Sequence, residues 1–201
     1  MTLFSSFIDT KILLLTDVFG ERVRYKNASL VSFSDGTTLL KAKEMFEAEN
    51  LTLDTFKVVV LFVGHADAPY DNKIFRKRYQ DLIQSVGKVN MTFKIVYVSL
   101  LPLKWDTTLF ALFKNRNAAL KCMCGKDADR QEKEFYCDAL GKMKIQGRIQ
   151  PEFISKGRLN MNGIRFFTRV LGHKLSAIQS LWPPKLDIQS NAFWKDNIED
   201  Y

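Results

Sequence analysis

The sequence contains no long apolar run, few cysteines and no segment of biased composition. Its most apolar stretches, at 57–64 and 93–102, are about half as long as the ~20 residues that a membrane-spanning helix needs. The first residues, up to Phe19, lack the basic start and the small-residue cleavage site of a secretory signal. No repeat of ~20 to 50 residues is visible. These absences predict an intracellular protein with no membrane segment and no repeat architecture.

The cysteines are three in number and lie close together at Cys122, Cys124 and Cys137. An odd, clustered set is typical of a reducing intracellular compartment rather than of a disulfide framework. A zinc site is the alternative, and it would need His65 or His173 as a fourth ligand. Because C-x-C is not a usual spacing for structural zinc, the pattern favours ordinary thiols and predicts neither a metal nor another cofactor.

The composition is that of a folded domain. With 201 residues, 46% of them hydrophobic and 12% aromatic, the chain is long and apolar enough for one packed core. We expect a single domain over residues 1–201. The composition of the final stretch, 185–201, is compatible with folding back onto this domain or with docking on a partner.

Positive charge is in excess. The 30 lysines and arginines outnumber the 22 aspartates and glutamates, which gives a net charge of +8 and an isoelectric point near 9.4. The cations gather in separate clusters at 21–27, 74–80, 113–121 and 155–158. Such a surplus favours a polyanionic partner such as nucleic acid. It does not identify one by itself, because many basic proteins bind no nucleic acid.

Strand patterns alternate with helix patterns along the chain. Two continuous apolar runs are typical of parallel strands that are covered on both faces. Strands are expected at 29–34, 57–64 and 93–102, with a weaker candidate at 134–140. Helices are expected at 37–50, 72–87, 106–122 and 162–182. This alternation predicts an α/β fold of three layers, α/β/α, with a mostly parallel central sheet of the flavodoxin-like type.

Three further expectations follow from the same patterns. The opening stretch, KILLLTDVF followed by ERVRYK, is expected to form an extra edge hairpin. The side chains of Leu40 and Ile74 are assigned to the buried faces of their helices, and Thr37 or Thr38 and Asp71 precede those helices as caps. In an open sheet of this kind, the functional cleft lies beyond the carboxyl ends of the strands.

Four short blocks of the sequence resemble the SGNH or GDSL hydrolase family. They are VSFSDGTTL at 31–39, LFVGHADA at 61–68, RNAALK at 116–121 and SKGRLNMNG at 155–163. The blocks follow the family's order over residues 28 to 178. The resemblance implies an SGNH hydrolase-like fold. In the family, a serine attacks an ester with the help of a histidine and an aspartate, and a glycine N–H and an asparagine amide hold the oxyanion.

The resemblance places other residues at the family's catalytic positions. Gly36 falls at the serine, Ala66 at the asparagine, Ser155 at the aspartate and Arg158 at the histidine. A guanidinium stays protonated at neutral pH and cannot act as a base. Because nucleophile and base act as a unit, the resemblance implies a domain that has lost this catalytic mechanism. The scaffold residues Leu159, Asn160 and Gly163 match the family.

One catalytic alternative is a rescue in which Ser34 is the nucleophile and His65 is its base. A serine at the end of a strand and a lone histidine more often make structural hydrogen bonds.

The arginine at 158 changes what such a site can bind. A permanent cation at the rim of a former acyl pocket favours an anion, and phosphate suits a guanidinium because two N–H groups can bind it together. We therefore expect an RNA-binding surface formed by Arg158, Lys156, Arg165, Arg169, Lys104 and Arg116. Trp105 offers a stacking plane for an unpaired base. The ordinary alternative is that these cations are solvated or paired with carboxylates, and that Trp105 packs in the fold.

Among SGNH-like domains without catalytic residues, the chain most resembles the OSK domains, the C-terminal domain family of the insect Oskar proteins. The likeness rests on size, basic charge and the altered blocks. It implies a non-enzymatic domain that binds mRNA, in particular 3′ untranslated regions, and that works with other proteins of cytoplasmic germ-plasm ribonucleoprotein granules and not with a membrane. A protein-interaction scaffold of the same fold and a cryptic ester hydrolase are the two alternatives.

Overall fold

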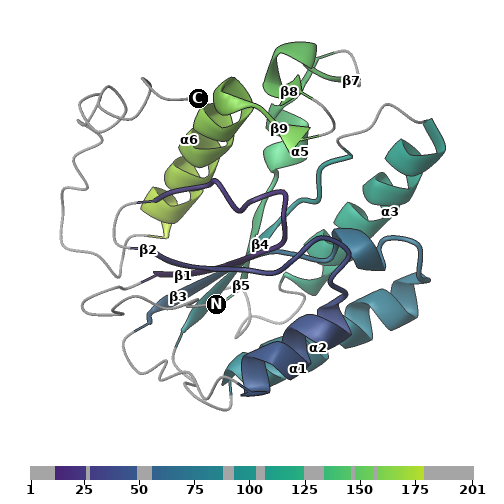
Figure 1. Cartoon of the computed structure of the whole chain (residues 1–201), viewed down its shortest axis with the longest axis vertical. Coiled ribbons are helices and arrows are strands. Elements are labelled where there is room, and N and C mark those ends of the chain that lie inside the picture. The colour runs from purple at the N-terminus through teal and green to yellow at the C-terminus, as the bar shows by residue number, and fades with distance from the viewer. Residues whose placement is uncertain are drawn as a thin grey trace.

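The structure is a computed structural model, and Figure 1 shows a central sheet with helices on both sides. It describes residues 12–25, 28–48, 56–87, 93–102, 107–124, 134–145, 148–155 and 158–178. The first half of the chain contains β1 (Ile12–Thr16), β2 (Ala28–Ser32), α1 (Leu39–Ala48), β3 (Val58–Phe62), the short 3₁₀ helix η1 (His65–Asp67), α2 (Asn72–Gly87) and β4 (Lys94–Val98). The second half contains α3 (Thr107–Met123), β5 (Glu134–Cys137), α5 (Ala139–Lys142), β6 (Lys144–Ile145), β7 (Arg148–Ile149), η2 (Pro151–Phe153), β8 (Ile154–Ser155), β9 (Arg158–Leu159) and α6 (Met161–Ala177).

The central sheet has five strands in the order β2-β1-β3-β4-β5, and every neighbouring pair is parallel. All residues of β1 and β3 are buried, whereas the edge strands β2 and β5 are mostly half-buried. This burial explains why the internal strands are continuous apolar runs. The predicted three-layer α/β/α fold with a parallel sheet is confirmed.

The prediction of an edge hairpin at the start of the chain is wrong. β1 does not belong to an edge hairpin, because it lies between β2 and β3 and runs parallel to both. Ile12 pairs with Ala28 on one side and with Val58 on the other. Residues 17–25 therefore carry the chain back along the sheet before β2 begins, and they do not make the tight turn that a hairpin needs.

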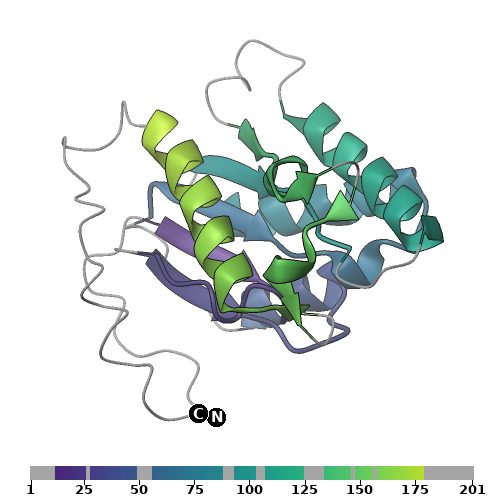
Figure 2. The ribbon, with the colours of Figure 1, turned by 90° about the horizontal axis from the view of Figure 1, so that it is seen from above.

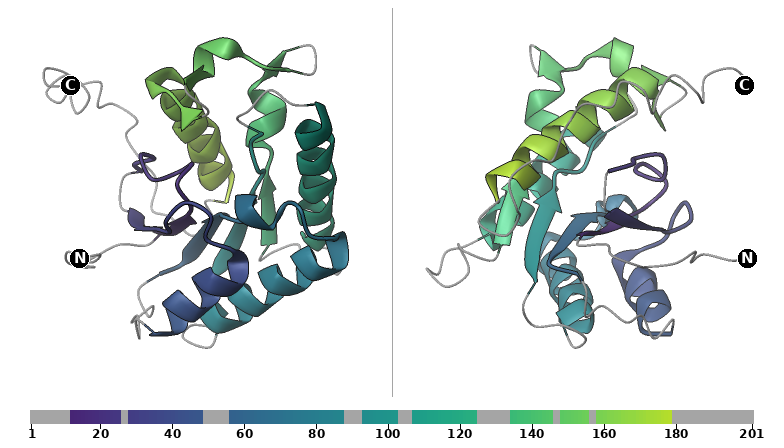
Figure 3. Two further views of the ribbon diagram at one scale, coloured as in Figure 1. Left: turned by 45° about the vertical axis from the view of Figure 1, so that its right-hand side comes forward. Right: turned by 90° about the vertical axis from the view of Figure 1, so that its left-hand side faces the viewer.

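Alternate residues of the strands enter two separate cores. Leu13 and Leu15 belong to the core beneath α1, α2 and α3, whereas Ile12 and Leu14 belong to the core beneath α6. Figure 2 and Figure 3 show α6 on the side of the sheet opposite α1 and α2. The stripe predicted for the last helix is confirmed, because all its apolar members are buried: Ile164, Phe167, Leu171, Leu175 and Ile178.

The predicted helix starts are also present. The side chain of Thr38 accepts a hydrogen bond from the Lys41 N–H at 3.3 Å, and that of Asp71 accepts one from the Ile74 N–H at 2.8 Å. Two assignments to buried faces are wrong, because Leu40 is 45% exposed and Ile74 is 40% exposed. Each lies one residue from a buried neighbour, where a helix has already turned by ~100°.

No helix within the described ranges is long and apolar enough to cross a bilayer. The final stretch, 185–201, lies outside the described residues.

Candidate functional site

Two adjoining cavities open where the parallel strands end. The first, which we call the Arg158 pocket, has a volume of about 350 Å³ and is lined by Val18, Phe19, Glu21, Arg22, Arg158 and Met161 together with their neighbours. The second, which we call the His65 pocket, has a volume of about 200 Å³ and is lined by Val18, Phe19, Gly36, His65, Ala66 and Phe113 together with their neighbours. Both lie where the sheet topology predicts a functional cleft.

The Arg158 pocket is built on a short hairpin that leads into α6. In the hairpin, Ser155 of β8 pairs with Arg158 of β9. Asn160 then caps α6, because its Oδ1 accepts the Gly163 N–H at 3.0 Å and its Nδ2 donates to the Glu152 carbonyl at 2.8 Å. A Cβ at Gly163 would lie 2.2 Å from the carbonyl oxygen of residue 153, so only glycine fits there. The matched L-N-x-x-G residues thus have a structural role: they fix the hairpin that carries Arg158.

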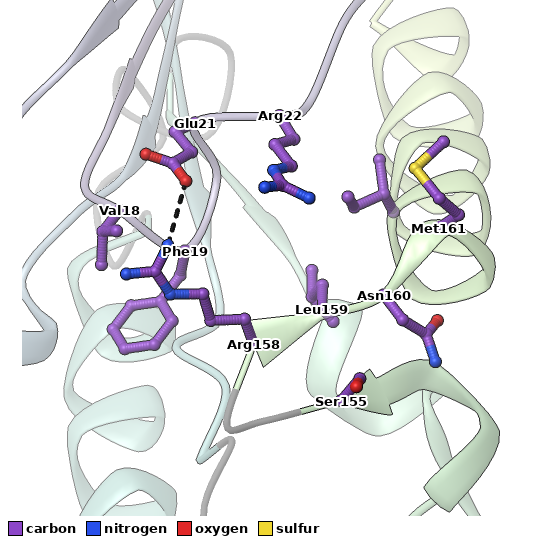
Figure 4. Close-up of a pocket in the computed structure, with 10 residues that line it drawn as sticks. Val18, Phe19, Glu21, Arg22, Ser155, Arg158, Leu159, Asn160 and Met161 are labelled. Carbon is purple, nitrogen blue, oxygen red and sulfur yellow. Dashed lines mark hydrogen bonds and ion pairs between the residues drawn. The ribbon is translucent and has the colours of Figure 1, made fainter. Parts of the chain in front are cut away.

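Arg158 crosses the pocket to a carboxylate on the opposite wall. Its Nη1 lies 3.3 Å from Oε1 of Glu21, and the two side chains are 52% and 38% exposed (Figure 4). An ion pair this exposed is worth ~0–1 kcal/mol because water screens it. The guanidinium is therefore a cation with a weakly held partner, which an incoming anion can replace.

The His65 pocket contains a buried aspartate–histidine pair, unlike the exposed pair at the Arg158 pocket. Nδ1 of His65 lies 2.6 Å from Oδ2 of Asp17, which follows β1 directly. The other oxygen of Asp17 accepts the Phe19 N–H at 3.2 Å. The two strands β1 and β3 end in register, with Thr16 opposite Phe62, and this brings the aspartate and the histidine together.

The remaining ring nitrogen of His65 is also occupied. Its Nε2 accepts the Leu101 N–H at 3.2 Å, so the ring carries its proton on Nδ1 and donates it to Asp17. The ring packs on Phe19 with 4.2 Å between centroids. The hydroxyl of Ser34 is exposed and bonds to the Thr37 hydroxyl at 3.1 Å. These contacts give both members of the Ser34 and His65 alternative a structural hydrogen bond.

The turn that carries His65 depends on a glycine. Gly64 has φ of 103°, a conformation that favours glycine, and a Cβ there would lie 3.1 Å from the Tyr79 ring. Two residues after His65, the fully buried carboxylate of Asp67 accepts the Leu39 N–H and an Arg78 N–H, both at 2.6 Å. The block GHAD therefore fixes the start of α1 as well as the wall of the His65 pocket.

The structure separates the four positions that the hydrolase resemblance assigns to catalysis. Gly36 and Ala66 line the His65 pocket, and Ser155 and Arg158 line the Arg158 pocket. The strand expected at 29–34 is present as β2, but it is not the first strand of the sheet, because β1 precedes it and occupies an internal place. The turn after the first strand is Thr16-Asp17-Val18, in which the third residue, like Gly36, has no hydroxyl.

The expected RNA-binding residues do not all lie on one surface. Arg158 is at the rim of its pocket, and Arg165 and Arg169 are exposed on α6. Met161, on the wall of the Arg158 pocket, precedes these two arginines at four-residue intervals, so the three side chains share one stripe of the helix. The predicted residues Lys104, Trp105 and Lys156 lie outside the described residues.

Arg116 has a different role from the one expected. It is only 6% exposed, and its guanidinium donates to the carbonyls of Ala68 and Tyr70 and to the side chain of Asn72. Burial lowers the pKa of this guanidinium below its ordinary value. The residue ties α3 to the segment between η1 and α2, and we leave it out of the proposed RNA surface.

One cation of the site was missed in the sequence. Arg22 is exposed, and it lines the Arg158 pocket from the loop after β1 (Figure 4). The basic cluster ERVRYK that contains it could be recognised in the sequence. Because this region was assigned to an edge hairpin, its position directly after an internal strand was not predicted. Within the described ranges, no carboxylate lies within ion-pairing distance of Arg22, Arg165 or Arg169.

The cysteines are separate thiols: Cys122 is exposed, Cys124 is half-buried and Cys137 is buried. Burial raises the pKa of both Cys124 and Cys137 to about 12, so these two thiols are protonated at neutral pH. Among the residues that the structure describes, no group of three His, Cys, Asp or Glu side chains converges as metal ligands would.

Comparison with known proteins assigns the fold and no more. No protein-family model and no curated protein sequence matches the chain. Several solved structures do, at low sequence identity. A Streptococcus pneumoniae protein named for platelet activating factor superposes with a TM-score of 0.70 and 15% identity over 86% of this chain and 87% of its own.

Two other solved structures extend this likeness. A GDSL-like lipase from Bacteroides thetaiotaomicron has a TM-score of 0.63 and 13% identity, over 84% of this chain and 89% of the lipase. A family 3 carbohydrate esterase from Clostridium thermocellum has a TM-score of 0.63 and 14% identity, over 86% of this chain and 98% of the esterase. The chain therefore has the SGNH hydrolase-like fold, as its sequence blocks predicted.

Proposed function

We propose that the chain is a non-enzymatic RNA-binding domain built on the SGNH hydrolase-like fold. The observation that carries this proposal is a row of exposed arginines. It starts with Arg22 and Arg158 at the Arg158 pocket and continues with Arg165 and Arg169 along α6. Of these four, only Arg158 has a carboxylate partner within the described residues, and that ion pair is exposed.

The row suits a phosphate backbone better than a single small anion. Positions four residues apart on a helix are separated by about 6 Å along its axis, so neighbouring arginines can contact successive phosphates of one strand. Each phosphate that an arginine neutralises releases counterions, which is the main source of affinity for nucleic acid. The net charge of +8 adds a long-range attraction to the same partner.

The pocket chemistry supports a binding role rather than ester hydrolysis. Arg158 carries a permanent charge and cannot take a proton from a nucleophile. His65 already donates Nδ1–H to Asp17 and accepts the Leu101 N–H, which leaves no ring nitrogen to activate a hydroxyl. Hydrolase activity of the solved structures with this fold belongs to those proteins, since a fold hosts many functions.

The resemblance to the OSK domains suggests which RNA and which partners are involved. The proposed ligand is mRNA, in particular the unpaired parts of 3′ untranslated regions, and the domain works with other proteins of germ-plasm ribonucleoprotein granules. No cofactor, metal or membrane takes part.

The experiment is a titration of labelled single-stranded RNA against the purified chain at two salt concentrations. For a surface that contacts several phosphates, affinity is expected to fall about tenfold or more between roughly 50 and 200 mM salt. The double change Arg165→Glu and Arg169→Glu is expected to weaken binding strongly and to flatten the salt dependence.

A matched control reverses two cations elsewhere. Lys73 and Lys77 are exposed on α2, on the opposite side of the sheet, so Lys73→Glu with Lys77→Glu changes the net charge equally. Equal losses in both double variants would show that binding follows net charge and not the α6 surface. RNA affinity unaffected by the α6 changes, or binding absent from the start, would favour the protein-interaction scaffold instead. Turnover of a small acyl ester that disappears in Ser34→Ala would favour the hydrolase.

A further inference from the structure

Phosphate binding by the exposed arginines does not account for the shape and the lining of the Arg158 pocket. Its volume of about 350 Å³ is at the lower end of the ~300–1,000 Å³ of small-molecule sites. The walls are mainly apolar, with Val18, Phe19, Leu159 and Ile164 among them. A surface that bound only phosphates would have no use for an apolar hollow of this size.

An exposed methionine stands at the mouth of this pocket. Met161 is 44% exposed, one of four large apolar side chains that are exposed among the described residues. Figure 4 shows it at the start of α6, across the pocket from Val18 and Phe19. A thioether is polarizable and packs well against the face or edge of an aromatic ring. Phe19 and Met161 therefore offer apolar contacts to a flat ligand from opposite walls.

Charge at the rim defines the rest of the ligand. Arg158 and Arg22 lie beside the apolar walls, so the ligand that fits best has a flat apolar body and an attached anion. Glu21 is the counter-charge at this rim, and its exposed pair with Arg158 opens at little cost. A strand of RNA that follows Arg169 and Arg165 along α6 reaches Met161 one turn later.

From these observations we infer that the Arg158 pocket takes one unpaired base of the bound RNA, whose phosphate lies on Arg158 and Arg22. This inference rests on the proposed RNA binding and adds a base site to it. Unpaired bases are the parts of RNA that proteins read by stacking and by enclosure, whereas a paired base cannot enter a pocket. The domain is thus expected to prefer single-stranded over double-stranded RNA.

The test removes the base and alters the pocket in turn. The probes are a short oligoadenylate and the same backbone without bases, both measured by fluorescence anisotropy at one salt concentration. Wild-type protein is expected to bind the oligoadenylate about fivefold or more tightly than the abasic strand, since one enclosed base contributes at least that much. The variant Met161→Ala, which removes the apolar contact at the mouth without changing the charge, is expected to reduce this difference while keeping its affinity for the abasic strand.

Two further variants guard the result. Ser155→Leu fills the pocket from the β8–β9 side with a side chain that cannot stack on a base, and it is expected to reduce the difference as well. Leu40→Ala is the matched control for Met161→Ala, because Leu40 is 45% exposed on α1, on the other side of the sheet. It is expected to behave like wild type. If both pocket variants still distinguish intact from abasic strands as wild type does, the base site is overturned and the arginine surface stands.

A last arm separates the two proposals. Adenosine 5′-monophosphate is expected to shift the Met161 methyl signal in NMR spectra, and ribose 5-phosphate is expected to shift it less. If oligoadenylate does not bind but the mononucleotide still shifts Met161, the proposed RNA binding fails and the pocket is a site for a free nucleotide, which overturns the inference as stated. If hexanoate shifts this signal and the mononucleotide does not, the pocket takes an acyl chain and the base site is overturned.

Discussion

A buried aspartate–histidine pair and an exposed glutamate–arginine ion pair lie at the same edge of the sheet and differ in almost every physical respect. Asp17 and His65 are 2.6 Å apart with side chains 6% and 5% exposed, whereas Glu21 and Arg158 are 3.3 Å apart with side chains 38% and 52% exposed. The first pair joins the turns after β1 and β3 in the interior. The second joins a loop to a hairpin at the rim of an open pocket.

The difference indicates which polar groups stabilise the fold and which can bind a ligand. Every oxygen and nitrogen of the buried pair has a protein partner, so replacing any of them by ligand contacts would expose unpaired groups. The rim pair is open to water and exchanges its partner at little cost. Function by anion binding therefore belongs to Arg158, and maintenance of the site's shape belongs to Asp17.

The largest effect is expected from the buried pair. Asp17→Ala leaves the buried His65 ring N–H and the Phe19 N–H without an acceptor, and it is expected to lower the free energy of unfolding by about 2–4 kcal/mol. Urea denaturation measures this loss. The control is Asp35→Ala. Among the described residues the exposed Asp35 accepts only the N–H of its neighbour Gly36, so its loss is expected to cost less than about 1 kcal/mol. Similar losses in the two variants would contradict a structural role for the buried pair.

The next effect compares two arginines. Arg116→Ala removes buried hydrogen bonds to Ala68, Tyr70 and Asn72 and is expected to cost about 1.5–3 kcal/mol of stability. Lys114→Ala, an exposed change on the same helix, is expected to cost less than about 0.5 kcal/mol. RNA affinity of the folded Arg116→Ala protein is expected to match that of Lys114→Ala. A much larger loss of affinity in Arg116→Ala alone would return this arginine to the RNA surface.

Much of the fold could be predicted because its signals are local. The runs at 57–64 and 93–102 are apolar since both faces of β3 and β4 are covered, and the stripe of α6 follows from its one buried face. The start of α6 was recognisable because L-N-x-x-G has direct geometric reasons, an asparagine cap and a close approach at Gly163, whereas the β8–β9 hairpin before it was not predicted.

The errors arose where a residue's role depends on partners far away in the sequence. β1 is internal because β2 and β3 pair with its two edges, and its short apolar run at 12–15 was the one local signal of this, which did not reveal the partners. In the sequence Arg116 resembles any surface cation of a basic cluster. Its hydrogen-bond partners, however, lie 44, 46 and 48 residues earlier in the chain. Arg22 was missed for the same reason, since its site exists only once β1 has been located.

The smallest effect is expected at the rim, where a single carboxylate competes with RNA. In the free protein Glu21 neutralises Arg158, and a phosphate must take its place. Glu21→Gln removes this competitor and also removes a negative charge that repels the strand. Because an exposed pair is worth ~0–1 kcal/mol, RNA affinity is expected to rise by up to about fivefold, with stability changed by less than about 1 kcal/mol. Glu44→Gln on α1 makes the same change in net charge on the opposite side of the sheet. An equal gain in both variants would mean that only net charge matters, and a gain in Glu21→Gln that persists undiminished in an Arg158→Gln background would mean that it does not come from freeing this arginine.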